Sequence, residues 1–366
     1  MRFLPLAAVA ALAMVVGAAP APAMSGGTTI DIATAPFLAT TGNCSGTLIA
    51  PDRVLMAAHC IDDIDFAGFG VFVGADLSQG GFPADKFFAA KGWAPAPGFK
   101  LEFPFNDDDP SEATAVNDVG IIVLERPVPG VTPVPIAGSR DEALERPGRP
   151  VRLLGFGDAP GPFPPFGNPP RSGNLTLISN PTCDRSYPNA VNGNDICAQD
   201  LDGDATLTQP CAGDSGGPLI ADGPRGPVLV GVTSWGSEVM GNGCGEAALP
   251  AVWMRVSRFR DFITDPHPTL APWTDGKVTL SGTGKLRCDA PAFEGSHAKL
   301  TYQWGIPRFP DPLIQAMPDP LEAIPGATKK HFRTGGPSSA GKRLVCAVTA
   351  TNASGSWTVY SLSADG

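Results

Sequence analysis

A serine, a histidine and an aspartate in the first two thirds of the chain have neighbours that suit them to acyl-transfer chemistry. Ser215 lies in the segment Gly213–Pro218, which reads Gly-Asp-Ser-Gly-Gly-Pro. A serine becomes a nucleophile when a base takes its proton and backbone N–H groups face the developing oxyanion. Glycines let the backbone approach a reacting carbonyl closely. The N–H groups of Gly213 and Ser215 are the candidates for that role.

The candidate base and acid are His59 and Asp118. The chain has four histidines, and the other three (His267, His297 and His331) lie after residue 265. Asp118 stands at the head of the apolar run 119–124. Taken singly, each is more often structural, as a satisfied core histidine or a turn residue. Together with Ser215 they supply a nucleophile, a base and an acid that can orient the base.

The elements that must position these residues are strands. Short β-type runs at 54–56, 71–73, 121–124, 151–154 and 228–232 are separated by turn residues, in a chain with 44 Gly and 40 Pro. This pattern favours an antiparallel β-barrel or sandwich over alternating β/α units. One helix is predicted over Val256–Ile263, with Arg255, Arg258 and Arg260 on a solvated face.

Four segments, at 57–60 (Ala-Ala-His-Cys), 117–121 (Asn-Asp-Val-Gly-Ile), 211–218 (Cys-Ala-Gly-Asp-Ser-Gly-Gly-Pro) and 233–236 (Thr-Ser-Trp-Gly), resemble the trypsin-like, chymotrypsin-fold serine proteases. The resemblance covers residues 24–265 and implies two six-stranded antiparallel β-barrels with a C-terminal helix. It implies an endopeptidase in which Ser215 attacks the scissile carbonyl and forms an acyl-enzyme. His59 would transfer the protons and Asp118 would hold the imidazole. No cofactor is implied, and the substrates would be proteins or peptides.

The eight cysteines contain no Cys-x-x-Cys pair, which favours disulfides over a metal site. Six of them precede residue 265 and allow 15 pairings. The resemblance selects Cys44–Cys60, Cys183–Cys197 and Cys211–Cys244.

The same resemblance places Gln209 at the floor of the substrate pocket, where trypsin-type enzymes carry Asp. Specificity for Arg or Lys is therefore not expected. The expected preference is for a medium-sized apolar or uncharged polar substrate residue. Asp204 is the alternative acid if the alignment shifts. The other substrate-binding residues would be Ser234, Trp235, Gly236 and Ala251.

The N-terminus has the pattern of a signal peptide over residues 1–23, with Arg2, an apolar run and small residues before the cleavage site. A secreted, extracellular protein is expected. In the resembled family a new α-ammonium inserts beside the acid that precedes the serine. Here Met24 would pair with Asp214 after signal removal, and the alternative is that Met24 begins a flexible tail.

The chain changes character after a Pro-rich linker at 266–272. Residues 24–269 carry 15 basic and 29 acidic side chains, whereas residues 270–366 carry 10 and 7. Cys288 and Cys346 lie in alternating runs with Trp304 between them, the arrangement of a sandwich whose bridge packs on a buried indole. Residues 273–366 resemble the Ig-like modules of secreted bacterial proteins. They are interpreted as an accessory module with an unknown ligand.

The remaining features limit the classes of partner and function that the chain can have. A net charge of −10 argues against nucleic acid as a partner, and no membrane span is expected after the N-terminus. The acidic clusters Asp107–Asp109 with Glu112, and Asp200, Asp202 and Asp204, are interpreted as solvated surface, so no metal is expected. We expect a monomer. The alternative functions are a catalytically inactive binding or adhesion protein and an esterase, whose usual triad order this chain does not have.

Overall fold

The structure is a computed structural model. It describes residues 24–61, 69–78, 80–103, 113–157, 168–240, 244–245, 248–311, 314 and 320–365. The predicted signal peptide and the acidic cluster Asp107–Asp109 with Glu112 lie outside the described residues. Among the described helices, none combines the length and the apolar character needed to cross a membrane.

The first six-stranded barrel carries three of the predicted runs in its wall. Residues 54–56, 71–73 and 121–124 all lie in strands, and side chains such as Leu55 and Ile121, which pair across neighbouring strands, are fully buried. The closed barrel runs in the order β2 (Leu38–Thr40), β3 (Ser45–Ala50), β4 (Arg53–Met56), β9 (Gly120–Leu124), β6 (Phe87–Pro95) and β5 (Gly70–Val73).

The second barrel closes through an antiparallel pairing between β11 (Arg171–Ile178) and β12 (Asp195–Gln199). The predicted runs 151–154 and 228–232 lie in its wall, and the short strand β1 (Thr28–Thr29) adds to its edge. Its strands are β10 (Pro150–Gly155), β11 (Arg171–Ile178), β12 (Asp195–Gln199), β13 (Pro218–Gly223), β14 (Gly226–Trp235) and β15 (Ala251–Arg255). The two six-stranded antiparallel barrels confirm the predicted fold of this part of the chain.

Short elements connect and flank the barrels. They are η1 (Ile32–Thr34), η2 (Ala58–Cys60), the hairpin of β7 (Lys100–Glu102) and β8 (Thr114–Val116), η4 (Glu142–Glu145), α1 (Asn180–Cys183) and η5 (Ser237–Met240). The predicted terminal helix is present as a 3-10 turn, η6 (Val256–Phe259), that continues into α2 (Arg260–Thr264). Arg258 and Arg260 are exposed. The prediction for Arg255 was wrong, because its half-buried guanidinium donates to the Glu145 carboxylate at 3.2 Å.

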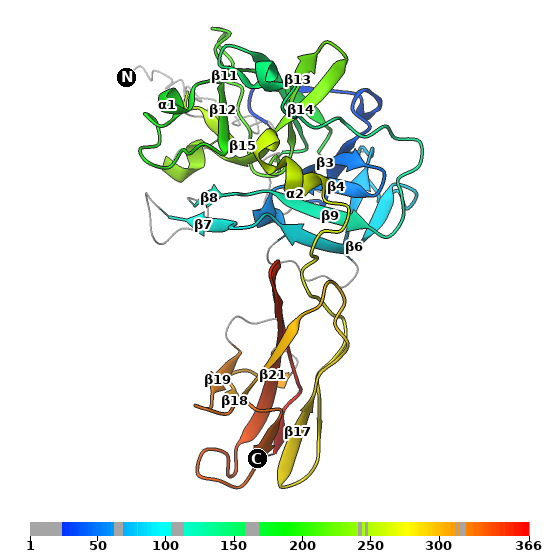
Figure 1. Ribbon diagram of the computed structural model, residues 1–366, viewed down its shortest axis with the longest axis vertical. Helices are drawn as coiled ribbons and strands as arrows, with labels where there is room; N and C mark the ends of the chain where they lie inside the picture. The colour runs from blue at the N-terminus through cyan, green and yellow to red at the C-terminus, as the bar shows by residue number, and fades with distance from the viewer. Residues whose placement is uncertain are drawn as a thin grey trace, which may run out of the picture.

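The C-terminal strands form two sheets that extend from the barrels as an elongated arm (Figure 1). A disulfide between Cys288 and Cys346 links one sheet to the other, and fully buried Trp304 lies in the same hydrophobic cluster as both sulfurs. One sheet contains β16 (Thr279–Ser281), β17 (Lys285–Asp289) and β20 (His331–Arg333). The other contains β18 (Lys299–Pro307), β19 (Leu321–Ala323), β21 (Arg343–Asn352), β22 (Gly355–Tyr360) and β23 (Ala364–Asp365).

The segment predicted as a linker is hydrogen-bonded on both sides. Ala271 N donates to the Trp93 carbonyl on β6 at 2.7 Å, and Asn352 Nδ2 at the end of β21 donates to the Leu270 carbonyl at 2.8 Å. The rings of Trp93 and Trp357 meet edge to face, with centroids 6.0 Å apart. The C-terminal sheets are therefore held against the first barrel by side chains and backbone.

Candidate active site

The strand register of the first barrel brings His59 and Asp118 together. His59 lies in η2, directly after β4, and Asp118 lies two residues before β9. Strands β4 and β9 are antiparallel neighbours, so the end of one lies beside the start of the other. His59 Nδ1 is 2.7 Å from Asp118 Oδ2, and the His59 backbone N–H donates to Oδ1 at 2.8 Å.

The Asp118 carboxylate is completely buried and bonded to several donors. Besides the two bonds from His59, the Ser234 hydroxyl donates to Oδ2 at 2.6 Å. Burial pushes the pKa of Asp118 upward, but the charge of His59 and these hydrogen bonds outweigh it and leave the pKa below its usual value. Asp118 is therefore ionised at neutral pH.

The His59 ring is set up to accept a proton at its outer nitrogen. Burial pushes the pKa of His59 downward, but the Asp118 charge and hydrogen bond outweigh it and raise the pKa above its usual value. In the tautomer that this network favours, Nδ1 carries the proton toward Asp118 and Nε2 has a free lone pair. The side chain is 26% exposed, so a reacting group can reach it.

The loop that carries Ser215 is anchored to the segment that carries His59. Ser45, on β3, donates its N–H to the Ser215 carbonyl at 2.9 Å and its hydroxyl to the Gly213 carbonyl at 2.8 Å. Gly216 has φ +80°, and a side chain there would collide with the Ser45 carbonyl oxygen. Cys60, bonded to Cys44, lies with its sulfur 3.8 Å from the Ser215 carbonyl oxygen.

The Ser215 hydroxyl and the backbone N–H groups of Gly213 and Ser215 have no partner in the part of the chain that the structure describes. The hydroxyl does not hydrogen-bond to the His59 ring, and the N–H groups of Gly213 and Ser215 donate to no acceptor there. In free enzymes a nucleophile–base hydrogen bond is often long and shortens with substrate. The two amides are available to an incoming oxyanion.

Asp214 and Met24 are both fully buried. Asp214 accepts hydrogen bonds from Gly157 N at 2.8 Å and Cys211 N at 2.9 Å. The residue after Met24, Ser25, forms an antiparallel bridge with Gln209, whose N–H donates to the Ser25 carbonyl at 3.0 Å. In this structure the chain at Met24 is therefore packed into the core of the second barrel.

The predicted pocket floor is neutral and its amide is already bonded. Gln209 Nε2 donates to the Leu249 carbonyl at 2.8 Å, and Oε1 accepts from Gly245 N at 3.0 Å. Asp204 is exposed and accepts from the N–H of Thr206 in its own turn. The other predicted pocket residues, Trp235, Gly236 and Ala251, are buried, as is Ser234 beside Asp118.

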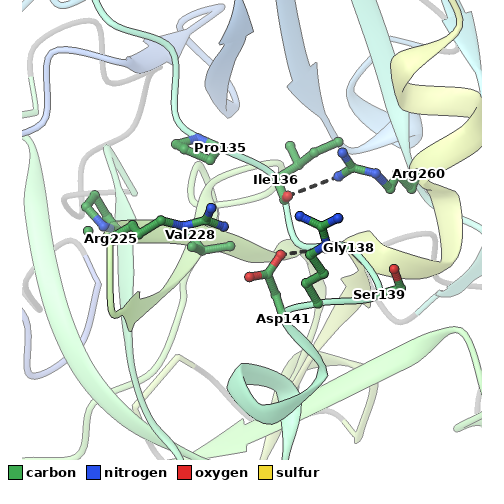
Figure 2. Close-up of a pocket in the computed structure, with 11 residues that line it drawn as sticks. Pro135, Ile136, Gly138, Ser139, Asp141, Arg225, Val228 and Arg260 are labelled. Carbon is green, nitrogen blue, oxygen red and sulfur yellow. Dashed lines mark hydrogen bonds between the residues drawn. The ribbon is translucent and has the colours of Figure 1, made fainter.

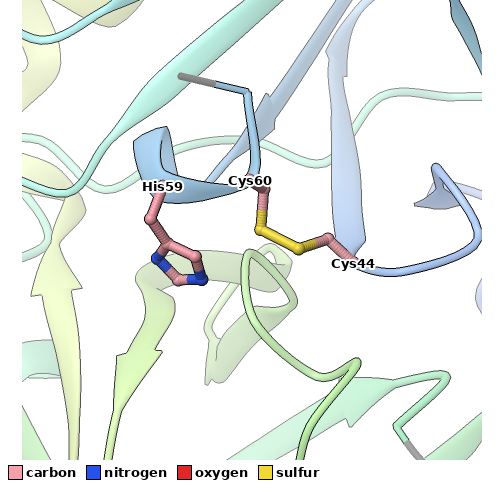
Figure 3. A group of neighbouring side chains, drawn as sticks. All are labelled: Cys44, His59 and Cys60. Carbon is pink, nitrogen blue, oxygen red and sulfur yellow. A yellow bond between two sulfur atoms is a disulfide. The ribbon is translucent and has the colours of Figure 1, made fainter. Parts of the chain in front are cut away.

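The cysteines pair as the resemblance implied: Cys44–Cys60, Cys183–Cys197 and Cys211–Cys244, with Cys288–Cys346 in the C-terminal sheets. Within the described residues, one cluster has three potential metal-ligating side chains, namely Cys44, His59 and Cys60. Its two sulfurs form a disulfide and cannot act as thiolates (Figure 3). The carboxylates of Asp200, Asp202 and Asp204 accept backbone N–H groups of their own loop.

Two residues that position the site, Ser45 and Asn117, were not among the predicted site residues. Ser45 joins the first barrel to the Ser215 loop, and its place directly after Cys44 was a signal that it lies near His59. Asn117 precedes Asp118 with φ +52°, a left-handed conformation that Asn tolerates better than most residues. An Asn before a candidate catalytic acid was a local signal for such a turn.

Comparisons with known proteins agree with this geometry. The family model described as Trypsin matches residues 24–263. Kallikrein 1-related peptidase b3 of Mus musculus is 32% identical over 224 residues, which is 61% of this chain and 79% of that protein. Glandular kallikrein of Sus scrofa is 29% identical over 224 residues, 61% of this chain and 85% of the relative. The solved structure of mouse neuropsin, a serine protease, covers 65% of this chain and 97% of its own, with 26% identity and a TM-score of 0.50.

The chain belongs to the trypsin family of serine proteases, because the family model spans well over half of it. It is a serine-type endopeptidase, a hydrolase of the class that its kallikrein and neuropsin relatives represent.

Proposed function

We propose that this endopeptidase cleaves peptide bonds with Ser215 as nucleophile, His59 as general base and acid, and Asp118 as the group that orients His59. The observation that carries the proposal is the buried Asp118 carboxylate, bonded both to the ring and to the backbone N–H of His59. The Ser215 loop is tied to the same barrel through Ser45 and lies against the Cys60 sulfur.

The chemistry follows from these contacts. His59 Nε2 takes the Ser215 hydroxyl proton as Oγ attacks the scissile carbonyl, and the imidazolium that forms is stabilised by ionised Asp118. The carbonyl oxygen becomes an oxyanion and accepts from the N–H groups of Gly213 and Ser215. His59 then gives its proton to the leaving amine, which leaves an acyl-enzyme. His59 then takes a proton from water, which attacks the acyl carbon. The bond between that carbon and Ser215 Oγ breaks, Oγ regains the proton from His59, and the second product leaves as a carboxylic acid.

Active-site labelling tests the proposal against the alternative of an inactive binding protein. Mature protein is treated with a fluorophosphonate probe, and the modified peptide is identified by mass spectrometry. We expect one adduct on Ser215, lost in His59→Ala because the serine then has no base. No adduct on folded protein, or an adduct on another serine, would contradict the assignment.

We propose a preference for a medium-sized apolar or uncharged polar residue on the acyl side of the cleaved bond. Neutral Gln209 offers no carboxylate to a substrate Arg or Lys, and its amide is bonded to Leu249 and Gly245. Ala251 adds a methyl group to the pocket wall that the resemblance predicts. A panel of chromogenic peptides that differ only at this position measures the preference.

We propose that the activating amine is freed by signal removal itself. The backbone pairing of Ser25 with Gln209 and the burial of Met24 support insertion of a new terminus at Met24 near Asp214. A buried ammonium is tolerable only beside a charge such as this carboxylate. N-terminal sequencing of active secreted protein tests this, and a start well after Met24 would contradict it.

We propose, finally, that the protein is a secreted, extracellular monomer with a catalytic domain at 24–265, a connector at 266–272 and an Ig-like accessory module at 273–366. Four disulfides fit an oxidising compartment. The inter-sheet disulfide that packs with buried Trp304 supports the Ig-like assignment. The ligand of the module is to be sought by binding assays on the whole protein.

A further inference from the structure

An open pocket outside the proposed active site is bordered by three separate parts of the chain. It has a volume of about 570 Å³ and lies between the segment 135–141, residues 225–228 at the start of β14, and Arg260 at the start of α2 (Figure 2). None of its lining residues belongs to the proposed triad, oxyanion site or substrate pocket.

Three arginines face this pocket without a carboxylate partner. Arg140, Arg225 and Arg260 are exposed, and none of them forms a salt bridge within the described residues. Arg260 is held in place because its guanidinium donates to the carbonyls of Ile136 and Ala137, both at 3.1 Å. Arg225 and Arg260 approach the pocket from opposite sides (Figure 2).

The one acid of the lining, Asp141, is bonded to the backbone of its own turn. Asp141 Oδ2 accepts from the backbone N–H of Gly138 at 3.1 Å and closes the turn that forms one side of the pocket. The chain as a whole has a net charge of −10. Three unpaired guanidinium groups around one hollow therefore contrast with the rest of the molecule and favour an anionic ligand.

The walls between the arginines are apolar. Pro135, Ile136, Pro227 and Val228 line the pocket together with the backbone. A ligand that fits must carry anionic groups and apolar groups a few ångströms apart. Guanidinium groups bind carboxylates with two parallel hydrogen bonds. A peptide with Asp or Glu next to an apolar residue meets both conditions, whereas a sulfated polysaccharide has no apolar side chains for these walls.

We propose that this pocket binds an acidic segment of a protein partner, with carboxylates on the arginines and an apolar side chain between the two prolines. Identification of that partner as a substrate rests on the proposed endopeptidase function. An acidic segment bound here would tether a protein substrate to the enzyme and raise its local concentration at the active site.

The test measures binding separately from catalysis. The probe is a fluorescein-labelled peptide of alternating Glu and Leu, and the protein is the full mature chain carrying Ser215→Ala, so that no probe is hydrolysed. Fluorescence anisotropy gives Kd at 50 and 200 mM salt. The reference peptide has Gln in place of every Glu. We expect the Glu peptide to bind at least tenfold more tightly than the Gln peptide, and less tightly at the higher salt.

Variants locate the binding. Arg140→Gln with Arg225→Gln removes two side chains that make no hydrogen bond within the described residues, so folding should be unaffected. We expect this double variant to weaken binding at least tenfold. The matched control is Arg258→Gln, an exposed arginine on the neighbouring helical turn that does not line the pocket. It should bind the Glu peptide as the parent does.

Equal binding of the Glu and Gln peptides, or unchanged binding in the double variant, would overturn the proposal. Displacement of the Glu peptide by a heparin oligosaccharide at lower concentration than by unlabelled peptide would assign the pocket to a polysaccharide instead. Failure of peptide binding leaves fluorophosphonate labelling of the Ser215 protein untouched. Failure of that labelling leaves the binding result untouched, so the two proposals are tested independently.

Discussion

Asn194 in the second barrel donates its side-chain amide to Asn117 Oδ1 in the first barrel at 2.9 Å. Asn117 directly precedes Asp118, and its own amide donates to the Pro97 carbonyl at 2.9 Å. Its φ of +52° turns the chain so that Asp118 points inward. Both barrels therefore hold the peptide unit that aims the proposed catalytic acid.

This contact makes Asn194 a positioning residue whose loss should affect turnover more than substrate affinity. We expect Asn194→Ala to lower kcat by about tenfold with little change in KM, because a small displacement of Asp118 misaligns His59. Steady-state kinetics on a chromogenic peptide measure both constants. Asn194→Asp is the conservative variant, and it loses the donor while it keeps the size. A rise in KM with unchanged kcat would contradict a positioning role.

Substitution of Asn117 separates its backbone conformation from its side-chain bonds. Asn117→Gly keeps the left-handed conformation at no steric cost but loses both hydrogen bonds, whereas Asn117→Ala loses the bonds and also strains the backbone. We expect Asn117→Ala to be the less stable of the two by about 1 kcal/mol in urea unfolding. If turnover in Asn117→Gly equals that of the parent, the side-chain bonds do not position Asp118.

The pH dependence of kcat/KM should report His59. Neutral His59 is the base, so activity falls as pH drops through its pKa, which Asp118 raises above the usual value. In Asp118→Asn the charge is gone, so the acid limb should move to lower pH. The plateau should fall by about 10⁴-fold, because the imidazole loses its tautomer and its charge partner. An acid limb that does not move in this variant would show that Asp118 does not raise the pKa of His59.

The buried carboxylate of Asp195 predicts that the stability of the fold decreases as pH rises. Burial raises the pKa of Asp195 to about 7, although Asn192 N and the Arg255 charge oppose the rise. One of its oxygens has no partner among the described residues, and the other accepts from Asn192 N at 2.7 Å. Between pH 4 and 7 the folded protein binds a proton that the unfolded chain has released. The stability that this bound proton contributes is therefore lost as pH rises through this window.

Asp195→Asn removes this titration. We expect the free energy of unfolding of the parent to fall by roughly 2 kcal/mol more than that of the variant between pH 5 and 7. Urea unfolding at the two pH values measures the difference, in inactivated protein so that autolysis is avoided. Asp261→Asn, an exposed acid on α2, is the control and should track the parent. Parallel pH profiles for parent and Asp195→Asn would show that Asp195 is ionised throughout.

The barrels could be predicted from the sequence because their strands show local apolar runs between turns. The pairing of His59 with Asp118 could be predicted because four segments occur in the order of the resembled family. Contacts between side chains that are far apart in the sequence could not be predicted in this way. Asp195 lies at the start of a strand much as Asp118 does, and it is buried where β12 pairs with β15. Arg255 looked solvated on the helix pattern, yet Glu145 on η4 lies beside it. The Pro-rich composition at 266–272 indicated a linker, and it gave no sign of the hydrogen bonds that join Ala271 to Trp93 and Leu270 to Asn352.

The Trp93–Trp357 contact predicts that the C-terminal sheets can be loosened from the barrels without loss of the active site. Trp357 is half-buried on β22 and packs edge to face on Trp93 of β6, far in sequence from His59 and Ser215. Trp357→Ala removes this aromatic pair and its buried area, a loss of about 2 kcal/mol. Since 1.4 kcal/mol is a factor of ten, cleavage of the 264–270 segment by an added protease should become roughly 30-fold faster. Turnover of a small peptide should stay unchanged, and Leu300→Ala, at an exposed position on β18, should alter neither rate. If the segment in Trp357→Ala were cut no faster than in the parent, the backbone bonds of Ala271 and Leu270 would be sufficient to hold the two parts together.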